Sequence, residues 1–129
     1  MNILLATDGR KNSEKAESYA FEYAKRYNAT LCVVHAVNPQ AEEDKELLAK
    51  RGMEKFDTLR MTGKDNGVEV KTFLEAGNPY QAALEVARRV KAEAIIVGTS
   101  GKTAIDRVLI GSVSEYVVRH ASCTAIVVR

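Results

Sequence analysis

The sequence has few of the features that mark disordered, secreted or membrane-spanning chains. Only two of its 129 residues are proline and eight are glycine, which argues against disorder. No apolar run approaches the ~20 residues that span a bilayer, and the first residues lack the basic segment of a signal peptide. The formal net charge of +2 is too small to indicate nucleic acid or a membrane surface as the main partner. We therefore expect one globular domain, residues 1–129.

Cysteine and histidine are also scarce, and their placement favours neither a disulfide nor a metal site. Cys32 and Cys123 each lie alone in an aliphatic segment, as reduced core thiols do. His35 and His120 are far apart and have no cysteine or carboxylate partner at the spacing of metal ligands, so we interpret them as packing residues. These features predict a cytoplasmic protein without a metal site of its own.

Short aliphatic runs alternate with segments of helical periodicity. Five runs predict strands at 3–6, 31–37, 68–74, 94–97 and 124–128. The segments between them predict four helices: one capped by Asn12 or Ser13, one over about 42–62, one after Asn78-Pro79, and one from Gly111-Ser112. The second helix is the least regular, because Gly52 lies inside it and destabilises a helix by about 1 kcal/mol relative to alanine.

This alternation predicts an α/β fold with a parallel sheet and helices on both faces. The continuous apolar run 94–97 is typical of a central strand buried on both sides. The alternating run 68–72 instead favours an edge strand. In such sheets ligands bind outside the carboxyl ends of the strands, where the strand order reverses. Asp8, after the first strand, and Gly98, after the fourth, would then face one crevice.

The glycines after the fourth strand form the most informative motif. Gly101-Lys102-Thr103 ends like a P-loop, but Ile96 stands where that loop needs its first glycine. The dinucleotide pattern G-x-G-x-x-G is absent here too. What remains is Gly98-x-x-Gly101, nine residues, then Gly111-Ser112. The spacing alone leaves two interpretations open: a phosphate clamp ending at a helix N-terminus, or merely a strand-end turn and a helix start.

The same pattern resembles the ATP-binding signature of the universal stress protein family. The resemblance extends to the whole chain: residues 3–9 (ILLATDG) look like that family's first strand and turn, 33–37 (VVHAV) its second strand, and 124–128 (TAIVV) its closing strand. It implies a Rossmann-like, five-stranded parallel sheet of order 3-2-1-4-5 with four helices on both faces.

Carried over position by position, the resemblance implies a nucleotide site. Glycine and serine residues of the motif would hold the phosphates, and Asp8 would lie on the ribose side. Ala6 and Thr7 would line the pocket. Ala36 would offer backbone groups to the adenine, with Val97 packing nearby. The phosphate residues are Gly98, Ser100, Gly101, Gly111, Ser112 and the Val113 backbone. The first turn departs from the family pattern, because Arg10 follows the glycine where relatives commonly have a serine, and Lys11 comes next. These two cations either reach the phosphates or face water, and we favour the second interpretation.

No nucleophile with an adjacent base and no paired carboxylates occur in the sequence. The leading hypothesis is therefore an ATP-binding regulatory or stress-response protein whose occupancy modulates shape or partner binding, with slow or no hydrolysis. Mg²⁺ would bridge the phosphates. The alternatives are an ATPase or nucleotidyl transferase, or a nucleotide-free interaction module. The aliphatic last strand, Thr124–Val128, predicts a homodimer through an exposed sheet edge.

Overall fold

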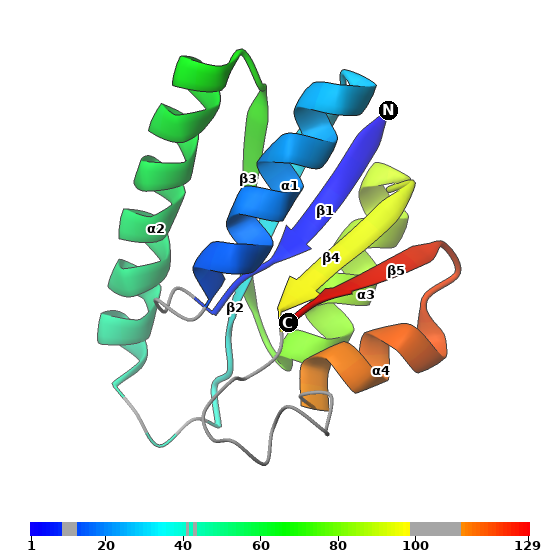
Figure 1. The fold of residues 1–129 in the computed structure, drawn as a ribbon. Coiled ribbons are helices and arrows are strands. Elements are labelled where there is room, and N and C mark those ends of the chain that lie inside the picture. The colour runs from blue at the N-terminus through cyan, green and yellow to red at the C-terminus, as the bar shows by residue number, and fades with distance from the viewer. Residues whose placement is uncertain (9–12, 41, 43, 99–111) are drawn as a thin grey trace.

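The computed structural model describes residues 1–8, 13–40, 42, 44–98 and 112–129, with the backbone alone described at 112–114. Within them five strands alternate with four helices, as predicted (Figure 1). The strands are β1 (Asn2–Ala6), β2 (Thr30–Val37), β3 (Val70–Ala76), β4 (Ala94–Gly98) and β5 (Thr124–Val128). The helices are α1 (Glu14–Tyr27), α2 (Lys45–Asn66), α3 (Pro79–Val90) and α4 (Ser112–His120).

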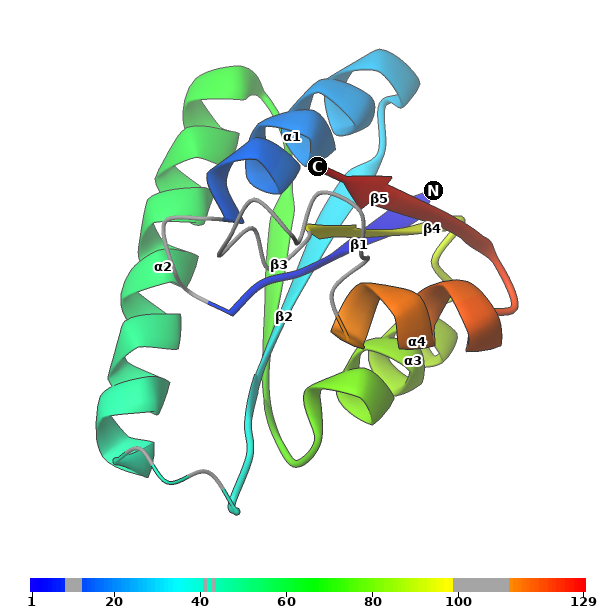
Figure 2. The same cartoon turned by 60° about the horizontal axis from the view of Figure 1, so that its bottom comes forward.

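All strands pair in parallel, in the order β3-β2-β1-β4-β5 that the sequence predicts. Helices α1 and α2 cover one face of the sheet, and α3 and α4 cover the other (Figures 1 and 2). The order reverses direction at β1, which pairs with β2 on one side and with β4 on the other. The crevice expected at the carboxyl ends of strands therefore falls between β1 and β4.

Two hydrophobic cores lie on opposite faces of the sheet. Successive residues of β1 alternate between them: Ile3 and Leu5 pack with α1 and α2, and Leu4 packs with α3 and α4. Strand β4 behaves in the same way, with Ile96 in the first core and Ile95 in the second. This double burial explains the continuous apolar runs of the central strands.

Helix α2 begins and ends later than the predicted range of about 42–62. It begins after Asp44, whose carboxylate accepts hydrogen bonds from the N–H groups of Glu46 (2.9 Å) and Leu47 (3.4 Å). It ends at Gly67, which has a left-handed φ of 68°. The predicted end was therefore too early: the helix continues through Gly63 to Asn66.

Two glycines allow α2 to lie close to the sheet. A Cβ atom at Gly52 would lie 2.2 Å from Cδ2 of His35 in β2, and one at Gly63 would lie 2.5 Å from Cγ2 of Val70 in β3. The two glycines are eleven residues apart, about three helical turns, so they share one face of the helix. Gly52, which weakened the helix prediction, is thus a point of contact between α2 and β2.

The starts of α1 and α3 follow the predicted signals in part. Asn78 caps α3 by accepting a hydrogen bond from the Tyr80 N–H at 2.8 Å, and Pro79 occupies the first helical position. Ser13 is the N-cap residue of α1, but its side chain makes no capping hydrogen bond. Its hydroxyl donates instead to Glu17 at 2.8 Å, which joins it to a polar network described below.

The two edges of the sheet differ in chemistry. On β3, which the alternating pattern correctly placed at an edge, Arg60 of α2 donates a hydrogen bond to Thr72, and Arg89 of α3 donates to Glu75 at 2.8 Å. On the opposite edge, β5 carries aliphatic, half-buried residues from Ala125 to Val128. Among the described residues, arginine side chains from two helices therefore bind the β3 edge, whereas β5 presents mainly aliphatic side chains.

No helix in the described part of the chain is both long and apolar enough to cross a membrane.

Candidate functional site

The predicted crevice begins where β1 and β4 end. Ala6 of β1 is aligned with Val97 of β4, so Thr7 and Asp8 leave one strand beside the point where Gly98 ends the other. The structure thus brings together two segments that are about ninety residues apart in sequence. This is the position at which open α/β sheets bind ligands.

Thr7, the first residue after β1, is held at all three of its polar groups. Its N–H donates to the Val34 carbonyl at 3.0 Å, and its hydroxyl donates to the Ser13 hydroxyl at 3.3 Å. Its carbonyl oxygen lies 3.1 Å from Nδ1 of His35. Thr7 is buried, whereas Asp8, the next residue, is exposed. The strand end is therefore fixed in place, and the carboxylate after it faces solvent.

A buried polar chain continues from Thr7 into α2. The Ser13 hydroxyl donates to Glu17 at 2.8 Å, and Nζ of Lys55 lies 3.2 Å from Oε2 of the same carboxylate. The side chains of Lys55 and Glu17 are only 14% and 10% exposed. Burying this ion pair is tolerated because both charges have close partners.

The other predicted site residues that the structure describes also lie near the carboxyl ends of the strands, but their surroundings differ. Val97 is buried in the core beneath α3 and α4, and Ala36, near the end of β2, is half-buried against the same core. A Cβ atom at Gly98 would lie 3.5 Å from Cβ of Ala16 in α1, an ordinary contact. Gly98 is therefore not required by packing within the described residues.

Part of the predicted motif lies outside the described residues: Ser100, Gly101 and Gly111, together with Arg10 and Lys11. Ser112 and Val113 form the first turn of α4, with only their backbone described. The first N–H groups of a helix have no partner within the helix and attract anions. The two ends of the glycine motif thus lead into a central strand end and a helix N-terminus.

Four polar residues around Thr7 were not predicted as site residues: Ser13, Glu17, His35 and Lys55. The prediction for His35 was packing, and it is buried; the structure adds its two polar contacts. The sequence signal for the position of the His35 ring was Gly52, a glycine inside a predicted helix, because the ring lies against this glycine.

The described residues carry no recognisable catalytic or metal-binding group. No cluster of three metal-ligating side chains occurs among them. Burial raises the pKa of the Cys32 thiol, and it also raises the pKa of the Cys123 thiol. On α4, Glu115 forms an ion pair with Arg119, four residues later, at 3.0 Å. Nothing in this part of the chain resembles a nucleophile with its base.

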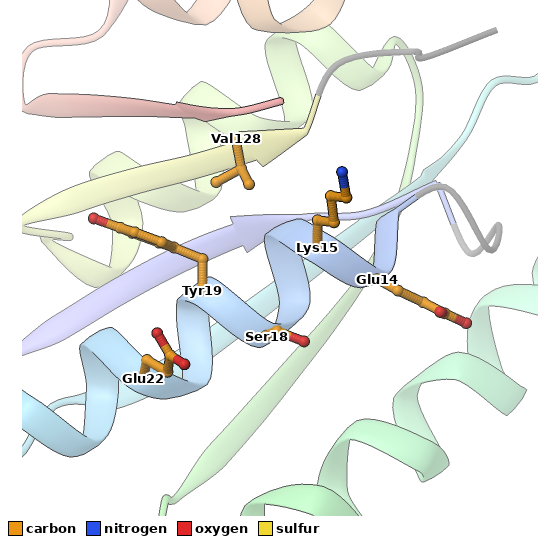
Figure 3. Close-up of a pocket in the computed structure, with 6 residues that line it drawn as sticks. All are labelled: Glu14, Lys15, Ser18, Tyr19, Glu22 and Val128. Carbon is orange, nitrogen blue, oxygen red and sulfur yellow. The ribbon is translucent and has the colours of Figure 1, made fainter.

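A shallow depression of about 420 Å³ lies elsewhere, between α1 and the end of β5 (Figure 3). Its lining comes from one side of α1 and from Val128, and it includes Lys15 and Tyr19. It is open to solvent and lies beside the β5 edge, not between β1 and β4. The ends of β1 and β4, where Asp8 and Gly98 come together, are therefore a separate candidate site from this depression.

Comparisons with known proteins agree with this architecture. The family model described as the universal stress protein family matches residues 1–129. A universal stress protein of Methanocaldococcus jannaschii is 31% identical, covering 98% of this chain and 81% of the relative.

Two solved structures have closely similar folds. A universal stress protein in complex with cAMP is 26% identical with a TM-score of 0.80, covering 100% of this chain and 97% of that one. The universal stress protein UspA from Lactobacillus plantarum is 27% identical with a TM-score of 0.81 and the same coverage. The match over the full sequence and the shared sheet order lead to one conclusion: this chain belongs to the universal stress protein family.

Proposed function

We propose that this protein binds ATP between the ends of β1 and β4, and that nucleotide occupancy modulates its conformation or its binding to a partner protein. One observation carries the proposal: Gly98, the first glycine of the phosphate motif, ends the strand beside the one that leads to Asp8. The similar structure determined with cAMP supports an adenine nucleotide as the class of ligand.

In this proposal each part of the crevice has a separate task. The phosphates lie against the glycines and the first turn of α4, where free N–H groups and the positive end of the helix attract oxygen anions. Asp8 accepts hydrogen bonds from the ribose, and Ala36 presents backbone groups to the adenine. The phosphate residues are those of the motif, Gly98, Ser100, Gly101, Gly111, Ser112 and Val113, with Ala6, Thr7 and Val97 lining the pocket.

The described residues fit a nucleotide at this position. Gly98 leaves the end of β4 without a Cβ atom although its own surroundings would accept one, and Asp8 is exposed beside it. Mg²⁺, when present, would neutralise phosphate charge. The chain's own groups then bind and orient the nucleotide rather than activate an attacking group, so we propose that hydrolysis is slow or absent. Turnover above about 1 per second would favour an ATPase instead.

The test begins with mass spectrometry of any nucleotide released from the purified protein. ATP titration calorimetry then compares the wild type with Gly98→Ala/Gly111→Ala. We expect the variant to fold, since a Cβ at 98 meets only an ordinary contact, and to lose most of its ATP affinity, because a phosphate held close to backbone leaves no room for side chains. No heat from the wild type with magnesium present would instead favour a nucleotide-free interaction module.

We also propose that two copies associate along β5. The strand is aliphatic and lies at the sheet edge. At the opposite edge, Arg60 and Arg89 donate hydrogen bonds to side chains of β3. Antiparallel pairing of two β5 strands would give an isologous dimer. Analytical ultracentrifugation tests this directly: a single species at the monomer mass of 14.2 kDa at micromolar concentration would contradict it.

The proposed location is the cytoplasm. Both cysteines are free thiols, and Cys32 is buried in the core, which suits a reducing compartment. Fractionation of the native cells with detection by antibody tests the location; recovery outside the cytoplasmic fraction would contradict it.

A further inference from the structure

The imidazole of His35 lies between two backbone carbonyls from different elements. Nδ1 is 3.1 Å from the Thr7 carbonyl oxygen, at the end of β1, and Nε2 is 3.2 Å from the Leu48 carbonyl oxygen in α2. His35 as a whole is 4% exposed, and its ring meets the ring of Phe56 edge-on, with centroids 6.5 Å apart. The ring is therefore fixed by contacts on several sides, and it joins a strand end to a helix.

Helix α2 is shaped to receive this ring. Leu48, Gly52 and Phe56 follow one another at intervals of four residues, so they lie along one face of the helix. A side chain at position 52 would occupy the space of the ring, since even a Cβ atom there would lie 2.2 Å from Cδ2 and 2.8 Å from Nε2 of His35. The missing side chain of Gly52 is what lets the ring reach the Leu48 carbonyl.

A second link joins the same strand end to the same helix. The Thr7 hydroxyl donates to Ser13, Ser13 donates to Glu17, and Glu17 pairs with Lys55 of α2. The backbone and the side chain of Thr7 are thus connected separately to α2. These contacts fix the position of Thr7, the residue from which Asp8 continues the chain.

We propose that His35 is a positioning residue for the nucleotide site: its ring fixes the Thr7 carbonyl to the backbone of α2 and so sets the direction in which Asp8 leaves β1. The inference rests on the proposed function, because Asp8 is the proposed ribose contact. Both facing groups are carbonyl oxygens, which only accept, so this role requires a proton on Nδ1 that is donated to Thr7. A pre-organised turn binds its ligand without first losing conformational freedom.

The experiment measures the ATP dissociation constant by calorimetry for the wild type and four variants. His35→Phe removes both ring nitrogens, and His35→Asn restores a donor near the position of Nδ1. Gly52→Ala leaves His35 in the sequence but displaces its ring. Gly63→Ala is the matched control. Gly63 lies on the same face of α2 as Gly52, but its Cβ would crowd Val70 at the start of β3, away from the carboxyl ends of the strands.

We expect His35→Phe and Gly52→Ala to weaken ATP binding about tenfold, the equivalent of one hydrogen bond. His35→Asn should recover part of the loss. Gly63→Ala should bind ATP like the wild type although it is less stable in urea, and this difference separates positioning from general destabilisation. Long-range nitrogen–proton NMR of the two histidines should show a protonated Nδ1 at His35.

The outcomes separate the two proposals. If the wild type binds no ATP, the proposed function falls and this inference falls with it. If the wild type binds ATP and His35→Phe binds equally well, the inference alone is wrong. Equal losses of affinity in Gly52→Ala and Gly63→Ala, or an unprotonated Nδ1, would also overturn it.

Discussion

Replacing Lys55 by methionine tests whether the buried ion pair stabilises the fold. The Glu17 side chain is only 10% exposed in the native protein. The change removes its cation and leaves the hydrogen bond that the Ser13 hydroxyl donates at 2.8 Å. Removing one partner of a buried pair costs about 3–5 kcal/mol, and some solvent access places this pair near the lower end, about 3 kcal/mol. For a chain of 129 residues, with an unfolding entropy of about 2.1 cal/mol/K per residue, this loss lowers the melting temperature by about 10 °C.

Urea unfolding followed by circular dichroism measures the loss, and a double variant identifies its cause. Glu17→Gln/Lys55→Met removes both charges, so it should recover more than half of the stability that Lys55→Met loses. Arg88→Met is the control, because it breaks an exposed pair on α3 and should not shift the midpoint measurably. If Lys55→Met unfolds at the same urea concentration as Arg88→Met, the buried pair stabilises the fold no more than an exposed one, and this prediction is wrong.

Three further predictions follow from contacts described above. Gly63→Ala should destabilise the protein by about 1–2 kcal/mol in urea, because crowding against β3 outweighs the better helix propensity of alanine; an increase in stability would contradict this. Asn78→Ala should cost about 1 kcal/mol by the loss of the α3 cap, measured in the same way, and no loss would mean that the cap contributes nothing. A thiol reagent should modify half-buried Cys123 before fully buried Cys32, and both slowly at neutral pH, because their raised pKa values keep the thiol form to higher pH than in free cysteine. Faster labelling of Cys32 in the native protein would be the contrary result.

The sequence was sufficient to predict the number of strands, the sheet order and the starts of three helices, because each depends on local composition or on the family resemblance. Strands buried on both faces need continuous aliphatic residues, as in 94–97, and Asn78-Pro79 carries its own start signal. The predicted 68–74 strand was displaced by two residues from β3, since the alternation there continues to Ala76. The true end of α2 depends on a left-handed glycine, and sequence alone does not separate Gly67 from Gly63.

The candidate site was only partly predictable. The meeting of Asp8 and Gly98 follows from the sheet order, so it was expected. The role of His35 was not, because it requires knowing that the ring lies against Gly52 of a helix that packs across the sheet. The Glu17 and Lys55 pair is likewise a contact between two helices 38 residues apart, with no local pattern to reveal it. The remaining predicted residues, from Ser100 to Gly111, lie outside the described residues.

If two copies pair along β5 as proposed, the unequal edges of the sheet would limit how far self-association proceeds. A sheet with two open edges has a valence of two, so copies can add at both ends and grow into a ribbon. Within the described residues, Arg60 and Arg89 bind side chains of β3, and β5 is the edge that we propose for pairing. A unit with a valence of one stops growing once it has paired. Charge reversal or truncation of either arginine would therefore be expected to matter less for the folded monomer than for the length to which assemblies grow.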